Sequence, residues 1–202
     1  MTLIRLLDGT RVYLHAVIDN FSRRILAWKT IAKFDPAITA EILNQAAEGV
    51  GVDKFETPPQ VMVDGGVENY NELVDAAIMT LKLKRQLAQT EITYSNSMIE
   101  AWWRVLKHQW LYLNQLDSCA TVTKLVTFYV DQHNTHLPHS AFKGQTPDEM
   151  YDSTGAEVPA QLELARTTAR AARRETNLAV SCRTCRAEID VVQLQSTLSD
   201  TS

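Results

Sequence analysis

Two acidic residues stand where the chain could bind a divalent metal. Asp64 follows the apolar run Val-Met-Val and precedes Gly65 and Gly66 in the stretch VMVDGGVENYN. Glu100 follows with 35 residues between it and Asp64. Hard cations such as Mg²⁺ take carboxylate oxygens as ligands, so this pair is a candidate metal site. A plainer interpretation is that Asp64 forms a turn and that Glu100 forms a surface ion pair with a cation four residues on.

Cations share the helix face of Glu100. Arg104 and Lys107 lie four and seven residues after it. Between Leu81 and Leu111 the chain has five cations and two acids: Lys82, Lys84, Arg85, Arg104, Lys107, Glu91 and Glu100. Such an excess can contact a phosphate backbone, although lysines also protect the exposed edge of a sheet. We favour Arg104 and Lys107 as phosphate contacts, and both interpretations stay open for Lys82 and Lys84.

The elements before Glu100 alternate in a way that predicts an α/β fold. TLIRLL, RVYLHAVID and RILAWKTIA are expected to be three antiparallel strands, with a hairpin turn at Asp8-Gly9-Thr10. Asp35-Pro36 predicts the start of a helix over 37–50. QVMVD reads as a short buried strand that joins the sheet in parallel, NYNELVDAAI as a helix and LKLKRQLA as a further strand.

The later elements are helical. Residues 95–116 show the strongest helical pattern, with one apolar stripe expected in the core: Ile99, Trp103, Leu106, Trp110 and Leu113. A second helix is expected over 121–134, and a looped stretch follows that closes near Tyr151. An Ala- and Arg-rich helix is expected over roughly 159–178, followed by a polar tail.

Composition describes an ordinary soluble domain. The 202 residues are 45% hydrophobic and 22% charged, with a formal net charge of −4. No run reaches the roughly 18–20 apolar residues of a membrane span, so a cytoplasmic protein is expected. Three cysteines, Cys119, Cys182 and Cys185, are too few for a secreted disulfide framework. The acidic total means that any nucleic-acid surface must be local.

Four blocks in unbroken order carry a family resemblance. They are YLHAVIDNFSRRILAW, VDGGVENYN, SNSMIEAWWRVLKHQWLY and YVDQHNTHLPHSAFKGQTPDEMY. Over about residues 2–151 the chain resembles the integrase core domain of bacterial insertion-sequence transposases, the DDE group related to retroviral integrases. The most specific feature is an Asp before Gly-Gly, 35 residues, and a Glu that opens an aromatic helix.

The resemblance implies a ribonuclease H-like fold: a five-stranded mixed sheet flanked by helices, with a C-terminal helical extension. Residues 1–152 would form the catalytic core and 153–202 the extension and tail. Asp64 and Glu100 would hold a two-metal Mg²⁺ or Mn²⁺ site for DNA cleavage and strand transfer. Gly65 and Gly66 would let DNA and metal approach the backbone, although a plain turn also explains them. The implied partners are transposon-end and target DNA and further copies of the chain, without a membrane.

The chain departs from the family at its first acid. Similar proteins carry this Asp on the first strand, in a pattern like Trp-x-x-Asp-Thr, which aligns immediately before Met1. Asp8 is expected to form the hairpin turn and Asp19 to end the second strand, so both are poor substitutes. We therefore expect weak metal binding and little or no strand transfer from this chain. The alternative is a non-catalytic nucleic-acid-binding or assembly remnant of a transposase; a purely hydrolytic nuclease would share the same residues.

Four weaker patterns remain open. Glu68 either joins the site or caps the following helix with Asn69, and we favour capping. His133, His136 and His139 are spaced like metal ligands, but Pro138 interrupts their helix. Cys182 and Cys185 form a single C-x-x-C, which is half of a closed zinc site. The arginines at 166, 170, 173 and 174 line one helix face, either as a solvated stripe or as a sequence-independent DNA contact.

Overall fold

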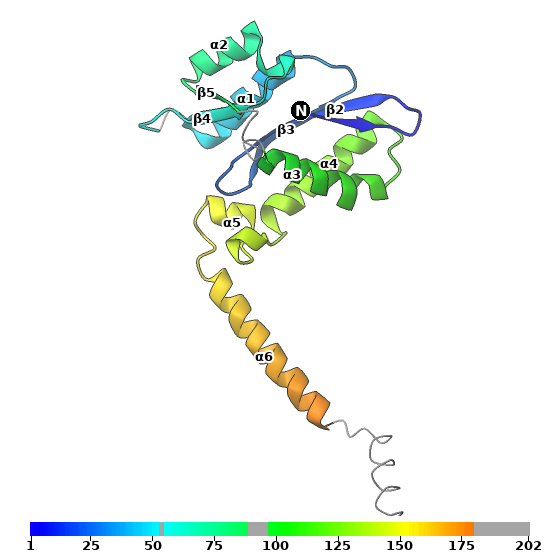
Figure 1. Ribbon diagram of the computed structural model, residues 1–202, viewed down its shortest axis with the longest axis vertical. Coiled ribbons are helices and arrows are strands. Elements are labelled where there is room, and N and C mark those ends of the chain that lie inside the picture. Colours follow the sequence, from blue (N-terminus) through cyan, green and yellow to red (C-terminus); the bar gives the residue numbers. More distant parts are fainter. Residues whose placement is uncertain (53–54, 89–96, 180–202) are drawn as a thin grey trace, which may run out of the picture. The chain divides into compact units, whose positions relative to one another are not determined.

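The computed structural model describes residues 1–52, 55–88 and 97–179. The chain divides into two compact units, Met1–Ala156 and Glu157–Ser202. The first unit contains β1 (Thr2–Arg5), β2 (Arg11–Ile18), β3 (Ile25–Ile31), α1 (Ala37–Val50), β4 (Gln60–Val63), α2 (Glu72–Thr80), β5 (Lys84–Leu87), α3 (Ser97–Gln109), α4 (Cys119–Thr135) and α5 (Pro147–Tyr151), with short 3-10 turns at Val67–Asn69, Leu111–Leu113 and Ser140–Phe142. The described part of the second unit is α6 (Val158–Ala179) (Figure 1).

The first three strands form the expected antiparallel sheet in the order β1-β2-β3. The turn between β1 and β2 is built by Asp8, whose Oδ1 accepts hydrogen bonds from the backbone N–H of Thr10 (2.9 Å) and from its hydroxyl (2.7 Å). Gly9 sits at φ 87°, a conformation that glycine adopts without strain. The turn between β2 and β3 is held by Asp19, whose Oδ2 accepts from Ser22 N–H and Oγ–H. Both acids therefore have the local roles that the sequence predicted.

The expectation of one five-stranded mixed sheet is wrong. β4 was expected to join the first three strands in parallel, but it pairs in parallel with β5, and the described strands form a three-stranded and a two-stranded sheet. The reason is the length of β1. Its four residues pair with Arg11–Leu14 of β2, so the second half of β2 has a strand partner only on the β3 side. No described strand bridges that half of β2 to β4.

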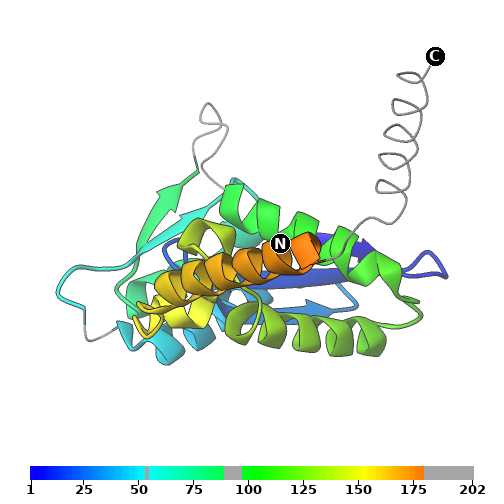
Figure 2. The same cartoon turned by 90° about the horizontal axis from the view of Figure 1, so that it is seen from below.

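Helices cover both faces of the three-stranded sheet (Figures 1 and 2). On one face, α3 and α4 pack against the strands and form the largest hydrophobic cluster, which contains Trp102, Trp103 and Leu106. On the other face, α1 packs against β2 and β3, and α2 packs against α1. Among the described helices, none combines the length and apolar character needed to cross a membrane.

The apolar stripe predicted for α3 is correct for its first half and wrong for its end. The helix ends at Gln109 and the chain tightens into the 3-10 turn Leu111–Leu113, so helical periodicity stops there. Leu113 is consequently 75% exposed, whereas Leu111 is fully buried. Trp102, which the stripe omitted, is buried beside Trp103, with ring centroids 4.8 Å apart.

Candidate functional site

Asp64 is held at the end of β4 by the turn that follows it. Its Oδ1 accepts hydrogen bonds from the backbone N–H of Gly66 (3.1 Å) and from the side-chain amide of Asn69 (2.6 Å). The side chain is exposed, and its Oδ2 has no hydrogen-bond partner among the described residues. One oxygen thus fixes the carboxylate, and the other is available to a ligand.

The two glycines after Asp64 have different surroundings. A Cβ at Gly65 would meet no atom within 4 Å, which leaves its backbone open to approach. A Cβ at Gly66 would lie 2.7 Å from the carboxyl carbon of Glu68. Glu68 is buried against this turn. A side chain at position 66 would therefore force the carboxyl group of Glu68 to move.

The prediction that Glu68 caps the following helix with Asn69 is wrong. α2 is capped by Asn71, whose side-chain oxygen accepts from the backbone N–H of Val74 at 3.0 Å. Asn69 instead donates to Asp64. Because Asn69 and Asn71 are equally good capping residues, the local pattern did not distinguish them.

Glu100 stands in the first turn of α3, outside the buried face of the helix. Trp102, Trp103 and Leu106 anchor that face in the hydrophobic cluster, which leaves Glu100 and Arg104 exposed. Lys107 is half-buried, and burial lowers the pKa of its ammonium. Glu100 forms no ion pair with any residue in the described ranges, so the surface ion pair with Arg104 is not present.

Asp64 and the first turn of α3 both border a cavity of about 730 Å³. It lies beside the second half of β2, and Asp64, Asn69, Asp19 and Ile99 are among its lining residues. Ile99 directly precedes Glu100, whose own side chain is not part of the lining. In the described part of the chain no three His, Cys, Asp or Glu side chains converge closely enough to hold a metal ion.

His15 is a cavity residue that the sequence analysis missed. It is 2% exposed on β2, and its Nδ1 lies 3.4 Å from the hydroxyl of Thr39 on α1. Its Nε2 has no hydrogen-bond partner within the described ranges. Burial, together with the positive N-terminal amino group, lowers the pKa of the ring to about 4. The strict alternation of β2, which points His15 to the same face as Val17, was the available signal.

The three spaced histidines have separate partners, and that of His136 is the hydroxyl of Thr135, which contacts its Nδ1. The His133 ring is buried, with Nε2 2.9 Å from the carbonyl oxygen of Arg23, while His139 accepts from Ala141 N–H at 3.3 Å. Burial lowers the pKa of both rings. Next to His133, Asn134 bonds both the N–H and the carbonyl of Ile25 at 3.0 Å, which fastens α4 to β3. Cys182 and Cys185 lie outside the described residues.

Sequence comparisons find insertion-sequence proteins. The chain is 24% identical over 156 residues to the transposase for IS904 of Lactococcus lactis, covering 76% of the chain and 60% of the relative. It is 20% identical over 147 residues to the putative transposase InsK for IS150 of Escherichia coli, covering 73% and 51%. An uncharacterized protein of IS136 from Agrobacterium fabrum is 24% identical over 144 residues. The chain thus spans between half and two thirds of the first two relatives, and no family model matches it.

Solved structures that align with this chain include retroviral integrases. A simian T-cell lymphotropic virus intasome in complex with a PP2A regulatory subunit aligns over 74% of this chain and 51% of its own, with a TM-score of 0.60 and 16% identity. The HTLV-2 integrase catalytic core domain in complex with magnesium aligns over 74% and 89%, with a TM-score of 0.55 and 16% identity. The expected α/β fold of integrase catalytic cores is therefore confirmed.

Proposed function

We propose that this chain, an integrase-type core domain of the insertion-sequence transposase group, acts on DNA in transposition through a divalent metal site on Asp64 and Glu100. The observation that carries the proposal is the shared cavity, which has Asp64 at the end of β4 and the first turn of α3 on its wall. The insertion-sequence relatives and the fold of integrase cores support the same chemistry.

The two carboxylates suit a hard cation. Asp64 has a free oxygen beside one that the turn fixes, and Glu100 has no ion-pair partner among the described residues. Mg²⁺ or Mn²⁺, when bound there, would supply positive charge to the oxygens of a phosphodiester. Asp64 and Glu100 would hold the ions, and the open backbone at Gly65 would admit the DNA strand.

Arg104 and Lys107 extend the site along α3 toward the phosphate backbone. Both lie on the helix face of Glu100; Arg104 is exposed, whereas Lys107 is half-buried four residues after Trp103. Arg104 can donate two parallel hydrogen bonds to one phosphate. Lys107 loses some of its affinity for a proton through burial, and a neighbouring phosphate would restore that affinity. These two cations would therefore orient the DNA strand so that one of its phosphodiesters lies beside the carboxylates of Asp64 and Glu100.

Similar proteins use three acids, and residues 1–202 contain counterparts of two of them. The register of β1 and β2 supports a position for the third. Thr2 faces Leu14, so Met1 faces His15 and a residue before Met1 would face Ala16, and Met1, His15 and Ala16 all line the cavity. An acid at that position would border the same cavity as Asp64. We propose that residues 1–202 bind metal weakly and perform little strand transfer, and that DNA ends, target DNA and further copies of the chain are the partners.

The test compares this chain with a version extended so that Asp directly precedes Met1. We expect the extended protein to gain at least about tenfold in Mn²⁺ affinity by calorimetry, because a ligand contributes at least as much as its supporting residues. Magnesium-dependent nicking and joining of a labelled duplex should rise in parallel. The matched control extends the chain with Asn instead of Asp.

Asp64→Asn and Glu100→Gln in the extended protein should each abolish the gain in metal affinity and in nicking. Unchanged Mn²⁺ affinity after adding the Asp, or full nicking by the Asp64→Asn protein, would refute the proposal. DNA binding without any metal-dependent reaction in the extended protein would favour the non-catalytic remnant. Nicking without joining would favour a hydrolytic nuclease.

A further inference from the structure

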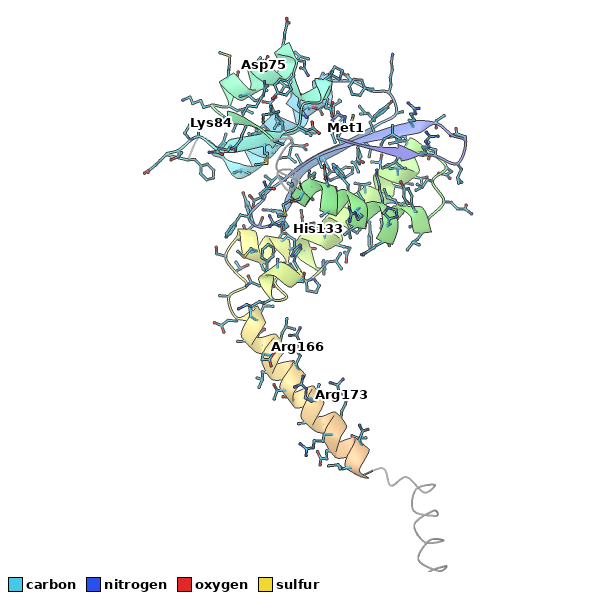
Figure 3. All side chains as sticks on the ribbon, viewed as in Figure 1. Met1, Asp75, Lys84, His133, Arg166 and Arg173 are labelled. Carbon is cyan, nitrogen blue, oxygen red and sulfur yellow. The ribbon has the colours of Figure 1, made fainter. Side chains whose placement is uncertain are left out.

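α6 presents its arginines as one continuous row. Arg166, Arg170, Arg173 and Arg174 stand at relative positions 0, 4, 7 and 8 of a 22-residue helix. At about 100° per residue they fall within an arc of about 100°, and they span about 12 Å of the helix axis. Figure 3 shows Arg166 and Arg173 projecting from α6. The row is therefore a single cationic face.

Few acidic side chains of α6 neutralise this face. α6 contains four arginines and two glutamates, Glu163 and Glu175, in a chain whose formal net charge is −4. The only ion pair of α6 among the described residues is Arg166 with Glu163, at 3.9 Å and with both side chains more than 70% exposed. An exposed pair of that length contributes little. Most of the positive charge is thus available to an external anion.

The helix does not use these arginines for its own packing. None of its residues is buried, and its apolar side chains are mostly alanine. All four cations are arginine, whose planar guanidinium matches phosphate better than an ammonium does. A row of about 12 Å can face roughly three phosphates of one DNA strand, since these are spaced about 3.4 Å apart along the duplex axis. An extended polyanion with regularly spaced charges fits this face.

We propose that the arginine face of α6, formed by Arg166, Arg170, Arg173 and Arg174, is a sequence-independent binding site for the phosphate backbone of duplex DNA. It uses different residues from the proposed metal site of Asp64 and Glu100, and it contributes to DNA affinity rather than to the reaction. The inference takes its partner from the proposed function, because that function names DNA as the substrate. Phosphate contacts of this kind position a protein on DNA and carry no sequence information.

The test measures the salt dependence of DNA binding by the full chain. The variant changes all four arginines to glutamine, which has a similar helix propensity. Binding to two unrelated 30-base-pair duplexes is followed by fluorescence anisotropy from 50 to 200 mM KCl. The slope of log affinity against log salt should become shallower by about 3, since the row faces roughly three phosphates and each phosphate contact contributes about 0.9. The loss should be equal on both duplexes.

A charge-matched control separates this face from a general effect of net charge. It changes four other exposed cations, Arg5, Arg11, Lys33 and Lys124, to glutamine. Arg→Lys at the four α6 positions keeps the charge and should keep most of the slope. The inference is overturned if the α6 and control variants give the same slope, or if the loss depends on the duplex sequence. It is also overturned if polyglutamate at equal charge displaces the chain as well as DNA does.

The two proposals fail in different ways. Asp64→Asn should remove nicking by the Asp-extended protein and leave the salt slope unchanged. Nicking that depends on Asp64, with a salt slope that is indifferent to the α6 arginines, would refute only the inference on α6. A slope that depends on these arginines, in a protein that never nicks, would refute only the catalytic proposal. A chain that binds neither duplex at 50 mM KCl would refute both.

Discussion

The two sheets of the first unit differ in how many of their side chains they bury. β1, β2 and β3 bury six: Ile4, Val12, Leu14, His15, Ile25 and Ala27. β4 and β5 together bury one, Val63. α3 and α4 cover one face of the three-stranded sheet and α1 covers the other. Since apolar burial is the main stabilising contribution, the three-stranded sheet is the scaffold.

The candidate carboxylates are divided between these regions. Asp64 follows the thinly buried β4, whereas Glu100 lies on a helix anchored by two buried tryptophans. A two-stranded sheet has little stability of its own. Functional segments are commonly drawn from the less stable parts of a fold, which open locally at low cost. In the proposed site, Asp64 therefore stands on the less buried side and Glu100 on the more firmly anchored side.

The largest effect is expected where α3 meets the scaffold. Leu106→Ala should lower the free energy of unfolding by about 3–5 kcal/mol, because it removes a fully buried side chain and leaves a cavity. Chemical denaturation measures the change. The matched control is Leu113→Ala, which alters a side chain that is 75% exposed and should cost less than about 0.5 kcal/mol. Equal losses would mean that α3 is not anchored as described.

An effect of intermediate size is expected at His15, on the opposite face of β2. The pKa of this ring falls from 6.5 to about 4 on folding, so between these pH values the unfolded chain binds the proton more readily. Stability should therefore fall as the pH drops from 6.5 to 4, by up to roughly 3 kcal/mol from this group. His133 contributes in the same direction, because burial lowers its pKa too.

Replacing His15 measures how much of this pH dependence of stability comes from its ring. His15→Leu should flatten the dependence of unfolding free energy on pH between 6.5 and 4, whereas the same change at the exposed His108 should not. Denaturant titrations at several pH values provide the measurement. An identical pH dependence in wild type and His15→Leu would show that the scaffold does not exclude a charged ring at this position.

The smallest effect is expected beside the two-stranded sheet. Asn71→Ala removes the N-terminal cap of α2 and should cost about 1 kcal/mol. Because α2 packs near β4 and β5, we expect faster amide hydrogen exchange in these two strands, with β1–β3 unaffected. Asn69→Ala is the control, since Asn69 bonds Asp64 rather than capping α2. If β2 and β3 also exchanged faster, the two sheets would form one cooperative unit.

Local features of the fold were predictable from the sequence. The Asp8-Gly9 turn, the three antiparallel strands and the long final helix depend on neighbouring residues, and all three are present. Asp64 and Glu100 were found from residue type and spacing. Trp102 and Leu113 were misassigned because their burial depends on where α3 ends and on what packs against it. His15 was missed because the alternation of β2 assigns it to one face of the sheet but does not indicate that a cavity lies on that face.

The sequence by itself determined the chemistry that is available: two carboxylates, each beside a turn or helix start, and a row of arginines at helical spacing. Tertiary structure decided which groups share a place. It brought Asp64 and the first turn of α3 to one cavity, and it separated five strands into two sheets. The physical reason is the sequence separation between the residues that interact. Turns and helices form from hydrogen bonds between residues a few positions apart, whereas strand pairing and cavities depend on which distant segments are present to fill the space.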